Sequence, residues 1–506
     1  MKHALSVTRQ NDFAEWYQQV VKVAGLAEHG AVRGCMNILP WGYSIWENIQ
    51  QKFDKRLKET GHRNAYFPLL IPLSFLAREA EHVDGFAKEC AVVTHHRLTS
   101  VDGRLMPDSD AQLEEPLVIR PTSETIIGDA FSRWVQSPKD LPLLINQWCN
   151  VMRWEMRPRL FLRTSEFLWQ EGHTAHATRN EANDEARLIL SLYTDFVTNV
   201  LCMPVYQGEK PPGERFPGAV NTWSIEAMMQ DGKALQSGTS HFLGQNFSKA
   251  YKIKFSSEGG DLFAWTTSWG ISTRLIGGVI MTHSDDNGLV LPPAIAPLHL
   301  RVLVLADDPT ETESLHSYIS SFLCSGPGLV SVLGEPLRHE IVNVGRRPGT
   351  AFWDCVKQGV PLIVQIGSKE KESGTVTYTI RTDSELKRQT IPAGQFVDSI
   401  SSLLNGMQRS LLERATQFRD ANTLSLSSVH DLREQFDRRP ISPFAICPID
   451  ISMESSTEFQ AELANRKLSV RCLLDSASSG HHLEDGSKCL FSGGQATHLA
   501  LIAKSY

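Results

Sequence analysis

The sequence predicts an α+β protein whose large first domain is an antiparallel sheet flanked by helices, followed by a smaller α/β domain and a third block. Up to about residue 290, short apolar runs lie between amphipathic helices without the regular strand–helix alternation of a parallel sheet. A stretch rich in turn residues and prolines, 285–297, would interrupt any regular element, and alternating strand and helix patterns follow it. We therefore expect domains over residues 1–290, 298–405 and 425–506.

The clearest element of the first domain is a helix over 45–57, where apolar residues recur at helical spacing. Strands are expected over 117–120, 143–148 and 160–162. Another helix opens at Thr122 and Glu124, and apolar residues between 126 and 135 give it one buried face. Because a carboxylate in a first helical turn is favoured by the helix dipole, simple capping is one interpretation of these two residues.

The second and third domains have a different pattern. Strands are expected over 299–305 and 360–366, and helices over 311–323 and 395–418, as in a small α/β domain. The last block contains a proline-bearing connection and Gly/Ser-rich segments.

Composition limits the function classes. The 506 residues carry 50 Lys and Arg against 57 Asp and Glu, a formal net charge of −7, which argues against a coat of nucleic acid but allows a local basic face. Nine cysteines without a Cys-x-x-Cys pair argue against a disulfide framework and for a reducing, cytoplasmic setting. We find no apolar run near the roughly 18 residues that a membrane span needs, so no membrane partner is expected.

A basic hairpin is the most informative segment. Arg153 and Arg163 are expected on two facing strands, with Pro158 at the bend between them. Guanidinium groups bind phosphate oxygens in a two-pronged geometry, and the ring of Phe167 lies four residues beyond Arg163 for stacking on a base. The hairpin therefore suits a polyphosphate ligand and a nucleic-acid end. The alternative is a solvated basic hairpin with core aromatics.

The motifs around this hairpin are informative together. Arg153-x-Glu155 followed by Arg163-x-x-x-Phe167-x-x-x-Glu171 resembles motif 2 of the class II aminoacyl-tRNA synthetases. With the segments 120–124, 146–150, 167–173, 234–241 and 267–274, the chain resembles the prolyl-tRNA synthetases of the archaeal and eukaryote-like type. This resemblance implies a class II catalytic domain, an α/β anticodon-binding domain and a small α+β C-terminal domain.

The resemblance also implies an activity and site residues. ATP would activate L-proline to prolyl-adenylate, and the prolyl group would pass to tRNA(Pro), with Arg153 and Arg274 as catalytic residues. The residues implied to bind ATP are Arg153, Glu155, Arg163, Thr164, Phe167, Gln236, Thr239 and Arg274. The residues implied to bind proline are Thr122, Glu124, Arg153, Trp169, His173, His241 and Ser272, although a lone histidine is more often a satisfied core residue. Mg²⁺ is implied with ATP, with Glu226 as its candidate ligand, and the helix near 41–60 with the 66–68 segment implies a homodimer.

Some positions depart from the family pattern. Ser165 stands where an arginine is usual, and Trp223 adds a bulky ring in a segment expected near the substrate. In the family, four C-terminal cysteines bind zinc, but here Ser452 and Ser492 stand where two of them are expected. Because serine is a poor zinc ligand, we predict no structural zinc. A rebuilt site remains an alternative, and its candidate ligands are Cys472, His481, His482 and Cys489.

Two other functions stay open at this point. A diverged paralogue could tolerate a proline-site inhibitor, or activate proline or an analogue for an acceptor other than tRNA. A non-catalytic tRNA-binding regulator is disfavoured because Arg153, Arg163, Phe167 and Arg274 are all present.

Overall fold

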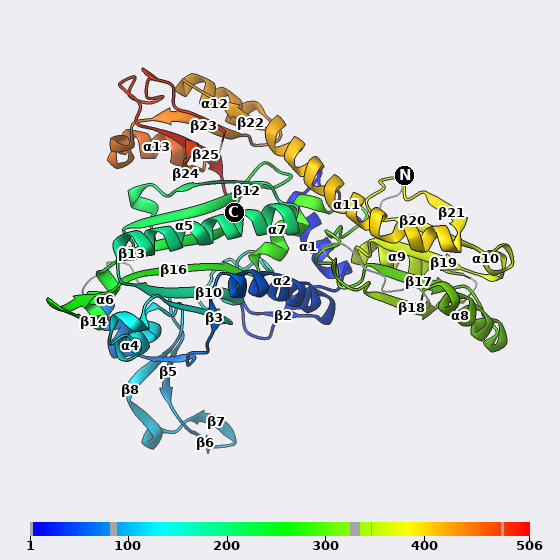
Figure 1. The fold of residues 1–506 in the computed structure, drawn as a ribbon, viewed down its shortest axis with the longest axis horizontal. Coiled ribbons are helices and arrows are strands. Elements are labelled where there is room, and N and C mark those ends of the chain that lie inside the picture. The colour runs from blue at the N-terminus through cyan, green and yellow to red at the C-terminus, as the bar shows by residue number, and fades with distance from the viewer. Residues whose placement is uncertain (1–3, 81–88, 324–333, 346, 477–479) are drawn as a thin grey trace.

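A long, mostly antiparallel sheet runs through the centre of the computed structural model, which describes residues 4–80, 89–323, 334–345, 347–476 and 480–506. In spatial order its strands are β22 (Thr423–Ser425), β23 (Phe444–Ile449), β25 (His498–Lys504), β24 (Leu468–Leu474), β11 (Val205–Glu209), β12 (Asn221–Met228), β13 (Ala234–Gly244), β16 (Trp265–Ser272), β10 (Glu166–His176), β9 (Leu143–Met152) and β3 (Arg63–Asn64). Only the β22–β23 and β3–β9 pairs among these strands are parallel (Figure 1). The predicted antiparallel class is confirmed.

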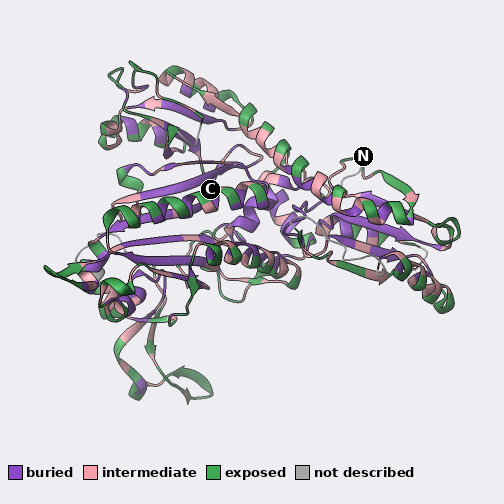
Figure 2. Cartoon of the chain, in the orientation of Figure 1, coloured by how far each residue is buried: buried purple, intermediate pink, exposed green. Residues whose placement is uncertain are grey.

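Helices flank the part of this sheet that the first domain forms. They are α1 (Phe13–Val23), α2 (Pro40–Glu59), α4 (Glu124–Trp134), α5 (Arg179–Asp195), α6 (Asn246–Tyr251) and α7 (Arg274–His283). The α2 helix contains the predicted 45–57 segment, and its apolar residues Ile45, Ile49 and Phe53 are fully buried. The purple interior of Figure 2 lies between these helices and the strands. This packing explains why the helical period was visible in the sequence.

An arm extends from the first domain at the bottom of Figure 1 and contains β5 (Val92–His95), β6 (Leu98–Val101), β7 (Arg104–Pro107) and β8 (Gln112–Ile119). At its base lie β4 (Leu70–Pro72) and α3 (Leu73–Ala80), and α3 packs against α4 and α6. The β8 strand pairs with β4 and β5, and β6 pairs with β7 at the tip. Two smaller hairpins complete the first domain: β1 (Ala27–His29) with β2 (Met36–Ile38), and β14 (Lys254–Ser257) with β15 (Gly260–Phe263).

The second domain has its own five-stranded sheet in the order β18-β17-β19-β20-β21. The strands are β17 (Leu300–Val304), β18 (His339–Asn343), β19 (Leu362–Ile366), β20 (Thr375–Ile380) and β21 (Arg388–Pro392), and the helices are α8 (Pro309–Leu323), α9 (Gly349–Gln358), α10 (Ser368–Ser373) and α11 (Ala393–Ala421). The β17 strand runs parallel to both of its neighbours, as expected of an α/β domain. The α11 helix continues well past residue 405, where the sequence suggested a boundary, and leads to the C-terminal domain (Figure 1).

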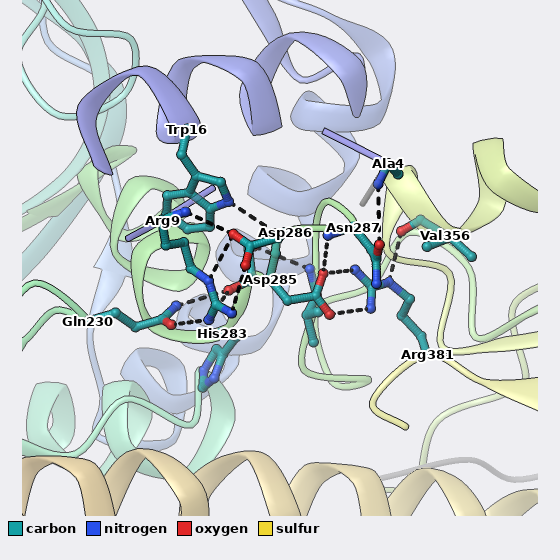
Figure 3. Close-up of polar contacts among 12 residues, drawn as sticks. Ala4, Arg9, Trp16, Gln230, His283, Asp285, Asp286, Asn287, Val356 and Arg381 are labelled. Atoms are coloured by element: carbon teal, nitrogen blue, oxygen red, sulfur yellow. Dashed lines mark hydrogen bonds and ion pairs between the residues drawn. The ribbon is translucent and has the colours of Figure 1, made fainter. Parts of the chain in front are cut away.

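A turn after α7 joins the first two domains (Figure 3). Both oxygens of Asp285 accept hydrogen bonds from Arg381 of the second domain, at 2.7 and 2.8 Å. The next residue, Asp286, binds Arg9 of the N-terminal segment through that residue's backbone N–H at 2.8 Å and its side chain at 3.3 Å. Burial alone would raise the pKa of Asp285, but the Arg381 guanidinium holds it below its usual value. One turn thus fixes two distant parts of the chain to the catalytic domain.

The C-terminal domain continues the catalytic sheet instead of forming a separate one. Its helices are α12 (Val429–Arg438) and α13 (Thr457–Asn465), which pack beside β23, β24 and β25. The β24 strand pairs with β11 at Gly208 and Glu209. A Cβ atom at Gly208 would lie 2.2 Å from the backbone oxygen of Leu473, so only glycine allows this approach.

Two local predictions were wrong. The 160–162 run is a buried turn, with Phe161 in the left-handed region at a φ of 62°, and not a strand. Arg153 and Arg163 lie just outside the ends of β9 and β10, in the connection between these strands. Among the residues described, no helix is long and apolar enough to cross a membrane.

Candidate active site

The β9–β10 pair places Arg153 at the wall of a pocket of about 350 Å³. The Arg153 backbone N–H donates to Ser165 at 2.7 Å, and its side-chain Nε donates to the Pro121 carbonyl at 2.9 Å. Its guanidinium lies 5.8 Å from the ring of Phe167 and 5.4 Å from that of Trp169. Burial lowers the pKa of Arg153 below the ordinary arginine value. The group nevertheless stays cationic at neutral pH because arginine starts so high.

The opposite charge enters from the start of α4. Ser123, the residue that precedes this helix, makes no side-chain capping bond, so the capping interpretation of this segment is not supported. Instead, the Thr122 hydroxyl donates to the Glu124 carboxylate, and both residues line the pocket. The electrostatic effect of Glu124 also reaches Arg153. An anionic group and a cationic group therefore share one cavity.

A buried carboxylate–histidine pair lies beside Glu124. Glu171 Oε2 is 3.0 Å from His173 Nε2, while Glu171 Oε1 accepts from Ser123 at 2.6 Å and from Gln147 at 2.8 Å. Burial works against both charged forms, yet their mutual hydrogen bond and attraction leave the pKa of Glu171 lowered and that of His173 raised. The pair therefore favours the protonated form of His173 and fixes the orientation of its ring.

His241 has the reverse character. Burial, together with the positive charges of His173 and Arg153, lowers its pKa to about 3. Its Nδ1 is 3.0 Å from the Thr222 hydroxyl, and the Phe216 ring lies 4.6 Å away, centroid to centroid. His241 is thus a neutral, partly apolar part of the same pocket wall.

Arg274, at the start of α7, forms the other cationic part of the pocket wall. Its backbone N–H donates to Ser272 at 3.2 Å, and its Nε donates to the Leu162 carbonyl at 3.2 Å. Burial and the neighbouring Arg153 lower the pKa of Arg274, whereas the Glu226 carboxylate opposes this change. The buried turn at 160–162 therefore orients an active-site arginine.

Most of the predicted site residues share this pocket. Those that line it are Thr122, Glu124, Arg153, Phe167, Trp169, His173, Gln236, Thr239, His241, Ser272 and Arg274. Four lie outside its lining: Glu155, Arg163, Thr164 and Glu226. Glu155 and Arg163 form an ion pair at 3.1 Å, and the Thr164 hydroxyl donates to the Glu166 carbonyl at 2.7 Å.

Glu226 is fully buried and does not have the surroundings of a magnesium ligand. Lys210 Nζ lies 3.2 Å from its Oε1, and Arg471 contacts both oxygens at 3.1 to 3.3 Å. Because two cations already neutralise this carboxylate, a divalent cation does not fit beside it.

Two departures from the family pattern have local explanations. Trp223 does not reach the pocket, because it points to the opposite face of β12 from Thr222 and is buried in the main core. The expectation that its ring approaches substrate is therefore wrong. Ser165 is buried, and its hydroxyl accepts from the Glu155 backbone N–H at 3.1 Å, close to the backbone of Gly34.

Sequence reasoning missed one wall of the pocket. It is formed by the connection between β11 and β12, whose residues Lys210, Glu214, Arg215 and Phe216 line the cavity. The available signal was a run of charged residues around Pro211, Pro212 and Gly213, which resembles an ordinary surface turn.

Among the described residues, the candidate zinc ligands Cys472, His481, His482 and Cys489 do not bring three ligand atoms within metal-binding distance of one another. Cys472 is buried in an apolar cluster next to β11. Over the described part of the chain, the one group of three ligating side chains within metal-binding distance is His430, Asp431 and Glu434, on α12. The prediction that no structural zinc is bound stays a prediction.

Comparisons with known proteins agree with this geometry. Residues 108–283 match the tRNA synthetase class II core domain family (G, H, P, S and T), and residues 328–403 match the anticodon binding domain family. The sheet, the flanking helices and the arginine-lined pocket thus define a class II aminoacyl-tRNA synthetase.

Full-length relatives give the specific family. The proline–tRNA ligases of Bdellovibrio bacteriovorus and Protochlamydia amoebophila are each 50% identical to this chain, over 99% and 100% of it and 99% of their own lengths. A crystal structure of the Cryptosporidium parvum prolyl-tRNA synthetase complexed with halofuginone and AMPPNP superposes with a TM-score of 0.88 at 33% identity, covering 99% of both chains. A second structure of that enzyme, complexed with L-proline and AMP, gives 0.87 at 32% identity, over 99% of this chain and 97% of that one. This chain belongs to the proline–tRNA ligase family.

Proposed function

We propose that this protein activates L-proline with ATP and transfers the prolyl group to tRNA(Pro). The observation that carries the proposal is the presence of both charges in one pocket, whose wall contains Arg153 and Arg274 together with Glu124 and the Glu171–His173 pair. A zwitterionic amino acid and a polyphosphate need this combination of charges. The relatives' names and the two ligand complexes of the Cryptosporidium parvum enzyme support the same assignment.

In the first step, the proline carboxylate attacks the α-phosphorus of ATP and pyrophosphate leaves. Arg153 binds the carboxylate and the α-phosphate together, which brings the reacting atoms close and stabilises the charge that develops on phosphorus. Phe167 stacks on one face of the adenine and Arg274 on the other. The remaining ATP-side residues are Glu155, Arg163, Thr164, Gln236 and Thr239.

Proline recognition depends on the acidic end of the pocket. Glu124 pairs with the positively charged ring nitrogen, and Thr122 holds that carboxylate in place. Trp169, His173, His241 and Ser272 surround the ring. In the second step, a hydroxyl of the terminal ribose of tRNA(Pro) attacks the prolyl carbonyl, and AMP leaves.

The remaining assignments complete the proposal. Mg²⁺ enters with ATP and neutralises the triphosphate, and Glu226 is not assigned as its ligand. The functional units are a catalytic domain over 1–290, an anticodon-binding domain over 298–405 and a C-terminal domain over 425–506. The enzyme works as a homodimer in the cytoplasm.

Two assays on the same preparation test this function: proline-dependent exchange of pyrophosphate into ATP, and charging of a tRNA(Pro) transcript. Arg153→Gln is expected to lower both rates by about 100-fold or more, since it removes a transition-state contact. Arg133→Gln is the matched control, because Arg133 is exposed and, within the described part of the chain, forms its ion pair with Asp129 on its own helix. Exchange without charging would favour the paralogue alternative, and absence of both reactions would refute the proposal.

A further inference from the structure

The C-terminal domain places one charged side chain beside the active-site pocket. Arg471, on β24, reaches Glu226 of β12, which is fully buried. Its Nε is 3.2 Å from Oε2 of Glu226, and its Nη2 lies 3.1 Å from Oε2 and 3.3 Å from Oε1. Nη1 donates to Ser469 on the same strand at 3.0 Å. This two-pronged contact joins residues that are 245 positions apart in the chain.

Glu226 connects Arg471 to the pocket wall. Its Oε1 also accepts from Lys210 Nζ at 3.2 Å and from the Ser224 hydroxyl at 3.0 Å. Lys210 Nζ lies 3.5 Å from Glu214 as well, and both of these residues line the pocket. The cations Arg471 and Lys210 and the anions Glu226 and Glu214 therefore form one neutral cluster. Its two buried members that do not line the pocket, Arg471 and Glu226, lie behind the pocket wall.

The wall beside this cluster is the ATP side of the pocket. Glu226 is directly opposite Gln236 in the β12–β13 pairing, and Gln236 is assigned to ATP. The Glu226 carboxylate raises the pKa of Arg274, and the Arg471 guanidinium lowers it, although burial and Arg153 have larger effects. Electrostatic influence from the cluster thus reaches the arginine assigned to the adenine.

We propose that Arg471 is a positioning residue for ATP binding, which holds the Glu226 carboxylate so that Lys210 stays available to the triphosphate. The inference rests on the proposed function, because it assumes that ATP occupies this pocket. Without Arg471, Lys210 would be the remaining cationic contact of Glu226 among the described residues, and Glu226 would draw that ammonium away from the ligand. The pocket wall would also gain one net negative charge, which repels a polyphosphate.

The test compares Arg471→Met with Arg433→Met in proline-dependent pyrophosphate exchange. Arg433 is a matched control, because it makes a two-pronged contact to Glu462, at 2.9 and 2.7 Å, on the exposed surface of the same domain. We expect Arg471→Met to raise the KM for ATP by about tenfold, which corresponds to the loss of one charge-assisted contact, with little change in the KM for proline. Arg433→Met should leave both constants unchanged.

A double variant distinguishes positioning from a general loss of packing. Combining Arg471→Met with Glu226→Gln removes both charges, so Lys210 is released and the KM for ATP should return toward the wild-type value. An equal rise in both KM values, no rise in either, or a double variant as weak as Arg471→Met would overturn the inference. Arg471→Lys serves if the methionine variant does not fold. It keeps the positive charge and loses the two-pronged contact, so a smaller rise than with methionine, again confined to the KM for ATP, is expected. Wild-type protein without exchange activity would instead refute the proposed function.

Discussion

The Asp285–Arg381 contact gives the most direct test of how the anticodon-binding domain is attached. Arg381 is 1% exposed, and besides Asp285 it donates from Nε to the Val356 carbonyl at 2.8 Å (Figure 3). Asp285→Asn preserves the size of the side chain but leaves a buried guanidinium without its counter-charge. Removing one partner of a buried pair costs about 3 to 5 kcal/mol, and we expect about 3 because the Asp285 side chain is 27% exposed.

Urea unfolding at pH 7 measures this cost, with intrinsic fluorescence and circular dichroism as separate probes since three domains need not unfold together. Pyrophosphate exchange should persist, because the pocket is elsewhere, while tRNA charging should fall. Asp285 has a lowered pKa, so its contribution is present above the unfolded-state value of about 3.9 and is lost as pH falls through the folded value. The difference between wild type and variant should therefore disappear in acid.

The neighbouring residue provides the control. Asp286 pairs with Arg9, whose side chain is 35% exposed, so Asp286→Asn should cost about 1 kcal/mol or less. If Asp286→Asn destabilised the protein as much as Asp285→Asn, or if the latter cost less than about 1 kcal/mol, the argument from burial would be refuted.

Two further substitutions test the attachment of the C-terminal domain and the decrease of the free energy of unfolding at acidic pH. Gly208→Ala should disrupt the β11–β24 pairing, because the new Cβ meets the Leu473 carbonyl, and limited proteolysis should then release the C-terminal domain faster. Gly406→Ala, at an open site on α11, is the control and should leave the rate of proteolysis unchanged. Burial lowers the pKa of His283 to about 3, so between about pH 6.5 and 3 the unfolded chain binds one more proton than the folded protein. Over this range the free energy of unfolding should decrease by about 1.4 kcal/mol for each unit by which the pH is lowered. His283→Gln should make the measured pH dependence shallower by that amount, and an unchanged slope would contradict the assignment.

Sequence patterns predicted the elements whose position depends on the spacing of nearby apolar residues. The helix over 45–57 was visible because Ile45, Ile49 and Phe53 face one core, and α2 extends it by only a few residues at each end. The connection between β9 and β10 was visible because Pro158 indicated a bend, but the strand ends were misplaced, since Arg153 and Arg163 lie outside both strands. The 160–162 run was not visible as a turn, because a buried turn and a buried strand have the same apolar composition. Its positive φ at Phe161 leaves no mark in the sequence of that segment.

Long-range contacts were invisible for a different reason. The orientation of Trp223 depends on which face of β12 meets the core. Successive side chains of a strand point to opposite faces of the sheet, but this rule alone does not say which face is the buried one. The partner of Glu226 lies in another domain, so a buried acidic residue could be read as a metal ligand until Arg471 was placed beside it. The motif residues were correctly grouped in most cases, but the charge state of their surroundings required the tertiary structure.

The shared sheet gives the C-terminal domain a source of stability that a small domain usually lacks. A domain of this size buries limited apolar surface, and such domains often depend on a metal or on a partner. Here, β24 pairs with β11, and the backbone N–H of the terminal Tyr506 donates to Ala234, the first residue of β13, at 3.1 Å. The same β13 strand carries Gln236, Thr239 and His241. Serine at positions 452 and 492, where the resemblance led us to expect cysteine, is therefore compatible with a folded domain, because the catalytic sheet supplies strand pairing on one side. The same attachment makes the active site sensitive to the C-terminal domain, which is why Arg471 can act on ATP binding from outside the pocket.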